Sequence, residues 1–145
     1  MRPAGLNLLL LVMASLLMNG CESGPEPIVA GKDNCYLCKM GITDTRYAAE
    51  VLTKKGKLYK FDDIDCLLSF VHSAMIDKQQ VKEIYLVDFA GDHELVKASA
   101  CFLLRDGKIH SPMNGNVIAF KNKDSLEFYM PRLKGERTNW EQLYK

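Results

Sequence analysis

The sequence predicts an α+β fold in which two similar ββα(β) modules pack as one small, pseudo-duplicated domain. Residues 48–71 and 99–130 both show the order strand, turn, strand, helix. In both stretches apolar runs mark the strands and a glycine marks the turn. In both, an aspartate opens a segment with apolar residues at helical spacing. We place the two modules at about 33–90 and 91–145.

The first module is predicted from a hairpin and the helix that follows it. Gly56 allows the positive φ that the hairpin turn needs. Apolar side chains recur at helical spacing from Ile64 to Met75, which predicts one buried helix face. The expected elements are a strand over Arg46–Thr53, a strand over Leu58–Phe61, a helix capped by Asp62 or Asp63 and ending near Ala74, and a strand over Ile84–Phe89.

The second module repeats this plan with weaker signals. A turn at Asp106–Lys108 separates its first strand from an irregular loop. The expected elements are a strand over Ser99–Leu104, a strand over Asn116–Phe120, and a helix that begins at Lys123 or Asp124, ends near Met130 and is stopped by Pro131. The C-terminal tail has no clear pattern, although Trp140 and Tyr144 are able to pack back on the domain.

The N-terminus has the features of a lipoprotein precursor. Arg2 precedes an apolar run over Leu6–Met18, which is too short to span a membrane and fits a signal peptide. Gly20 stands directly before Cys21, as in a lipobox. We therefore predict a signal peptide over 1–20, a lipid on Cys21 and a flexible tether over 21–32. The alternative is an ordinary signal peptide with a chance cysteine.

Export and lipidation place the protein on the periplasmic face of the cell envelope, anchored to a membrane, with the outer membrane as the favoured one. Without Arg2 the basic and acidic residues are equal in number, at 18 each. A near-neutral chain with no basic stripe is not expected to bind nucleic acid. Hydrophobic residues make up 48% of the sequence, which is enough to bury a core.

Soft metal ligands stand together in the motif Cys35-x-x-Cys38-x-Met40. Four cysteines in an exported domain form two disulfides by default. A thiolate with a nearby thioether instead favours Cu(I), whereas a zinc site would require more cysteine or histidine. The motif alone leaves open that Cys35 and Cys38 are bridged or buried and that Met40 lies in the core.

Four further residues have more than one interpretation. Met113 lies on a loop where burial gains little, so it is either a ligand or a filler of a local gap, and His110 is either a ligand or solvated. Cys66 lies near a helix N-terminus, where its pKa would be lowered, but it is also placed to be a half-cystine or a core residue. Cys101 is expected in a strand, as a core residue or a half-cystine.

Three motifs in order resemble the NosL family, copper-binding lipoproteins that are accessory to nitrous-oxide reductase. They are Asp33-x-Cys35-x-x-Cys38-x-Met40-x-Ile42, Tyr59-x-Phe61-Asp62-Asp63, and Ser111-Pro112-Met113 ahead of Ala119-Phe120. The resemblance implies two ββαβ-type modules. It also implies that Cys38, Met40 and Met113 bind Cu(I), with Cys35 and His110 as additional candidates.

The favoured interpretation is a periplasmic, membrane-anchored Cu(I) chaperone that is not an enzyme. By the resemblance, it delivers copper for the maturation of nitrous-oxide reductase, to the reductase itself or through membrane transporter assembly factors. The main alternative is a thiol–disulfide oxidoreductase that uses Cys35 and Cys38. A third is a structural lipoprotein with two disulfides. A count of free thiols separates the three.

Overall fold

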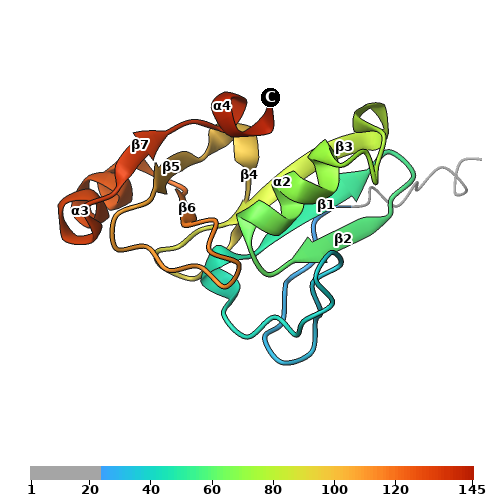
Figure 1. Cartoon of the computed structure of the whole chain (residues 1–145), viewed down its shortest axis with the longest axis horizontal. Helices are drawn as coiled ribbons and strands as arrows, with labels where there is room; N and C mark the ends of the chain where they lie inside the picture. Colours follow the sequence, from blue (N-terminus) through green and yellow to red (C-terminus); the bar gives the residue numbers. More distant parts are fainter. Residues whose placement is uncertain (1–23) are drawn as a thin grey trace, which may run out of the picture.

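Two antiparallel sheets lie side by side in the computed structural model, which describes residues 24–145 (Figure 1). The predicted signal peptide and the lipid site at Cys21 lie outside these residues. Among the described residues no helix has both the length and the apolar character that a membrane span requires. The elements after the N-terminal loops confirm the α+β class.

The first sheet has the strand order β2-β1-β3-β4. Val51 in the central strand pairs with Tyr59 on one side and Ile84 on the other. The helix α2 crosses one face of this sheet, and all five residues of β1 are buried (Figure 1). The elements are β1 (Ala49–Thr53), β2 (Leu58–Phe61), α2 (Ile64–His72), β3 (Val81–Val87) and β4 (Leu95–Lys97).

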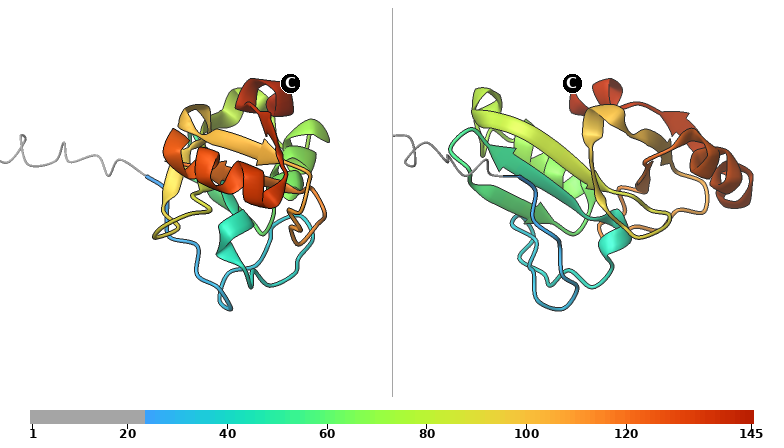
Figure 2. Two further views of the ribbon diagram at one scale, coloured as in Figure 1. Left: turned by 90° about the vertical axis from the view of Figure 1, so that its left-hand side faces the viewer. Right: turned by 180° about the vertical axis from the view of Figure 1, so that it is seen from behind.

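The second sheet has the order β6-β5-β7, so its first strand is central, as β1 is between β2 and β3. This shared order is compatible with the predicted duplication. The helix α3 packs on β5 and β6. The elements are β5 (Phe102–Arg105), β6 (Val117–Phe120), α3 (Lys123–Leu133), β7 (Glu136–Thr138) and α4 (Trp140–Tyr144). Figure 2 shows the two sheets and their helices from two further sides.

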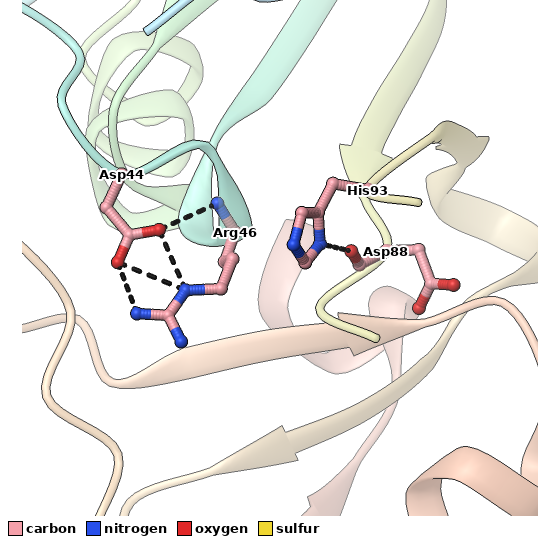
Figure 3. Close-up of polar contacts among 4 residues, drawn as sticks. All are labelled: Asp44, Arg46, Asp88 and His93. Carbon is pink, nitrogen blue, oxygen red and sulfur yellow. Dashed lines mark hydrogen bonds and ion pairs between the residues drawn. The ribbon is translucent and has the colours of Figure 1, made fainter. Parts of the chain in front are cut away.

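Two predicted strands start later than expected because a 3-10 turn precedes each. Thr45–Tyr47 form such a turn, and the Asp44 carboxylate accepts from the Arg46 backbone N–H at 3.1 Å and also pairs with the Arg46 guanidinium at 2.6 Å (Figure 3). Ala98–Ala100 form another turn, so β5 begins only at Phe102. The prediction that Cys101 lies within a strand is therefore wrong.

Helix lengths also differ from the prediction. The helix α3 continues through Pro131 to Leu133, so the predicted stop at Pro131 is wrong, and it ends where Lys134 takes a left-handed φ of 52°. The helix α2 ends earlier, at His72. Met75 consequently lies beyond the helix with 57% of its surface exposed, and its predicted place on the buried face is wrong.

The C-terminal tail packs back on the domain, as predicted for Trp140 and Tyr144. Both side chains pack against the main core with Leu143. The tail also gives the exposed His72 a partner, because Nε2 of His72 lies 3.2 Å from the Tyr144 carbonyl oxygen. The exposed His93 is similarly held, with Nδ1 at 2.9 Å from the Asp88 carbonyl oxygen (Figure 3).

The segment before the first motif is docked on the first sheet through a buried carboxyl group. Glu50 in β1 accepts a hydrogen bond from the Glu26 backbone N–H at 3.2 Å, and its other oxygen has no partner. Lys60 donates to the Pro27 carbonyl oxygen at 2.9 Å and to Asp33 at 3.0 Å. Burial raises the pKa of Glu50 to about 7. The ordered domain thus begins before Asp33, the residue at which the sequence predicted it to start.

Candidate metal centre

The Cys35–Met40 motif forms a tight loop ahead of β1. The Cys35 N–H donates to the Met40 carbonyl oxygen at 2.8 Å, and Lys39 closes the loop with a positive φ of 66°. An antiparallel bridge between Asn34 and Gly41 flanks the loop. The Tyr36 N–H donates to the Lys60 carbonyl oxygen at 2.8 Å, which fixes the loop to β2.

Three thiols and a carboxylate converge beneath this loop. The ligand atoms of Cys35, Cys38, Asp62 and Cys66 all lie within 4.8 Å of one another. The Cys38 thiol donates to the Asp62 carboxylate, with Sγ–O distances of 3.6 and 3.7 Å. The loop supplies two thiols, the residue after β2 supplies the carboxylate, and the first turn of α2 supplies the third thiol. We call these four residues the thiol cluster.

The thiol cluster is buried on one side and partly open on the other. Cys35 and Cys66 are 1% and 2% exposed, and Cys38 is half-buried. Burial raises the pKa of Cys35, and the hydrogen bond to Asp62 adds to this. Burial, Cys35 and Asp62 raise the pKa of Cys66 as well. These groups outweigh the helix N-terminus, so the expected lowering of the Cys66 pKa is wrong.

All four cysteines of the described residues are free thiols, which argues against two disulfides. Cys101 lies apart from the thiol cluster. Its Sγ donates to the Lys97 carbonyl oxygen at 3.4 Å, and burial raises its pKa to about 12. It occupies the edge of the main core.

The loop that carries Met113 is tied to the same end of α2. Asp63 caps the helix, with one oxygen accepting from the Asp65 N–H at 2.9 Å. Its other oxygen accepts from the Met113 N–H at 2.8 Å. A Cβ on Gly115 would lie 2.4 Å from the Asp65 Cβ, so only glycine allows the loop to pass this close. The two sheets also meet here at the end of β3, through the bridge between Asp88 and Ala119.

Comparison with known proteins assigns the family. The sequence model of the NosL family matches residues 28–145. The chain belongs to the NosL family. The crystal structure of the copper chaperone NosL from Shewanella denitrificans is similar in fold, with a TM-score of 0.70 and 22% identity over 83% of this chain and 95% of that one. No curated protein matches the chain.

In this NosL family member the two motif methionines face solvent. Met40 is 49% exposed, so the interpretation that it lies in the core is wrong, and Met113 is 37% exposed on its loop. His110 is also exposed. Met40 accepts a backbone hydrogen bond from Cys35 of the thiol cluster, and Met113 donates one to Asp63, the neighbour of Asp62. A meeting of the two methionines at one site stays a prediction. Their role as copper ligands stays a prediction.

Two members of the thiol cluster were missed as site residues by sequence reasoning. Asp62 was assigned only to helix capping, but Asp63 makes the cap, which leaves Asp62 to face the thiols. Cys66 was interpreted as a reactive thiol, a half-cystine or a core residue, and the sequence did not indicate which residues it contacts. The signal was their spacing: the residue before an N-cap and the third helical residue lie at the same helix end, where a nearby loop carries two more thiols.

Proposed function

We propose that this protein is a Cu(I) chaperone, anchored on the periplasmic face of a membrane, that delivers copper for the maturation of nitrous-oxide reductase. One observation carries the proposal most directly. Three free thiols converge within 4.8 Å of one another at the N-terminal end of α2, where the Met113 loop is bonded to the helix cap Asp63. Family membership and the fold shared with a copper chaperone add support.

The ligand chemistry suits a monovalent soft ion. Cys38, Met40 and Met113 are the proposed Cu(I) ligands, with Cys35 and His110 as additional candidates. Thiolate and thioether donors select Cu(I) because both are soft and polarizable. The exposure of both methionines leaves room for a partner's ligand to approach the ion. Transfer then proceeds by ligand exchange, which makes the protein a carrier rather than an enzyme.

The location and partners follow from the N-terminus and the family. A signal peptide over 1–20 and a lipid on Cys21 would hold the domain at the membrane where exported cuproproteins are loaded. The recipient is nitrous-oxide reductase, directly or through the membrane transporter assembly factors that serve it. Copper is the cargo, and its receipt and release are the whole of the activity.

The oxidoreductase alternative fits the structure less well. Redox-active C-x-x-C thiols are usually partly exposed and have a lowered pKa. Here the motif lies on a loop before β1, and the buried Cys35 has a raised pKa. The buried Cys35 is therefore poorly suited to attack a disulfide.

The copper content of nitrous-oxide reductase tests the proposed function. In native cells that lack this protein, the purified reductase is expected to be copper-poor, as measured by elemental analysis. Wild-type protein and the Cys101→Ser control should restore the copper, because Cys101 lies outside the thiol cluster. Cys38→Ser should not. A reductase that is fully loaded in the deletion strain would contradict the proposal.

A further inference from the structure

The three cysteines of the thiol cluster and the two motif methionines differ in how deeply they are buried. Cys35 and Cys66 are almost completely buried, whereas Met40 and Met113 are exposed. Cys38 is half-buried between them, with its Sγ inside the thiol cluster and Met40 two residues further along the chain. Within the thiol cluster, Cys38 thus lies nearer to the surface than Cys35 and Cys66 do.

We propose that Cys35 and Cys66, with Cys38 as a shared ligand, form a second Cu(I) site beneath the exposed one, so that the loaded protein holds two Cu(I) ions bridged by the Cys38 thiolate. This inner site rests on the proposed function, because it takes the same cargo. The exposed site of Cys38, Met40 and Met113 would exchange copper with partners. The inner site would hold its ion out of their reach.

Charge supports two ions rather than one. Cys35 and Cys66 are almost completely buried, and the buried Asp62 lies beside them. Three thiolates around one Cu(I) would leave two negative charges beside Asp62, in a pocket where uncompensated charge is costly. A second Cu(I) halves that excess. Each S–H that is replaced by an S–Cu bond gives its proton to water, and copper stays Cu(I), so no oxidant or reductant is required.

The competing explanation is that the buried thiols only fill space. Free cysteine does pack as a small apolar residue. A purely apolar role does not account for Asp62, which is 3% exposed and lies with its carboxylate 3.6 Å from the Cys38 sulfur. A carboxylate among thiols is a poor apolar neighbour, but it accepts a hydrogen bond from the Cys38 thiol.

The number of Cu(I) ions bound by the reduced, oxygen-free protein tests this inference. Native mass spectrometry of the wild type should show two Cu(I) ions, and X-ray absorption should show a copper–copper scattering path. Cys66→Ser and Cys35→Ser should each hold one ion. The matched control Cys101→Ser should still hold two, because this thiol lies outside the cluster. Met113→Ala should also hold two, with only the exposed ion weakened.

The outcomes separate the inference from the proposed function. A wild-type protein that holds a single Cu(I), lost with Met113→Ala and kept with Cys66→Ser, would overturn the inner site but leave the chaperone in place. Failure to bind Cu(I) tightly at all, or zinc that Cu(I) does not displace, would overturn both. Cys66→Ala replaces the serine variant if thermal melts show that serine unfolds the protein. The wild-type X-ray absorption spectrum decides the question without any variant.

Discussion

Replacing Cys38 with serine is expected to lower Cu(I) affinity at least a hundredfold, or about 2.7 kcal/mol. Cys38 supplies the proposed thiolate of the exposed site, and its sulfur also lies within 4.8 Å of the two buried thiols. A serine hydroxyl is a hard, neutral donor that cannot replace a thiolate for Cu(I). Both copper positions should therefore weaken together. The measurement is an anaerobic titration against a chromogenic Cu(I) chelator.

The Cys101→Ser variant is the control for the Cys38 result. It also removes one free thiol from the same domain, but at a position outside the thiol cluster. Its Cu(I) affinity should stay within about twofold of the wild type. Equal losses in the two variants would show that copper binding does not depend on the cluster, and would argue against Cys38 as a ligand.

Met113→Ala is expected to lower the affinity of the exposed copper site at least tenfold, about 1.4 kcal/mol. The variant removes one thioether from a proposed site of three ligands, while the Met113 backbone N–H can still bind Asp63. The fold should change little, because Met113 is 37% exposed and a core Met→Ala change costs roughly 2–5 kcal/mol. Thermal melts and Cu(I) titrations of the same variant separate the two effects.

Met75→Ala is the matched control for Met113→Ala. Met75 is also an exposed methionine outside regular structure, but it follows the C-terminal end of α2, whereas Met113 is bonded at the N-terminal end. Its loss should leave Cu(I) affinity unchanged. If Met113→Ala lowers the melting temperature strongly and leaves copper affinity intact, Met113 is a packing residue and the exposed site lies elsewhere.

Elements with local signals were predicted well from the sequence. The strand β2 has the predicted bounds, because alternation and a glycine turn define it locally. The start of β1 was missed because a side-chain contact of Asp44 folds Thr45–Tyr47 into a turn before the strand. The end of α3 was missed because Pro131 was predicted to stop the helix, which instead continues to Leu133 and ends at the left-handed Lys134.

The candidate site was only partly predictable from the sequence, because some of its residues meet only in the folded structure. Cys38 and Met40 share a motif, and the repeat placed Met113 near them at the seam. Cys66 joins them only through tertiary contact with Cys35, 31 positions earlier in the chain. Burial, together with the neighbouring Cys35 and Asp62, raises the pKa of Cys66, although this residue lies at the start of a helix. The spacing of residues along the chain predicts neither the contact between Cys35 and Cys66 nor the burial that raises the pKa of Cys66.

The most direct test is a competition between Cu(I) and Zn(II) for the reduced wild-type protein, with X-ray absorption to count sulfur neighbours. We expect Cu(I) to bind far more tightly than Zn(II) and to have sulfur neighbours. Binding should weaken as the pH falls, because protons compete for the thiolates and the raised pKa of Cys35 strengthens that competition. Tight, stoichiometric Zn(II) binding with no preference for Cu(I) would contradict the account and indicate a structural metal site.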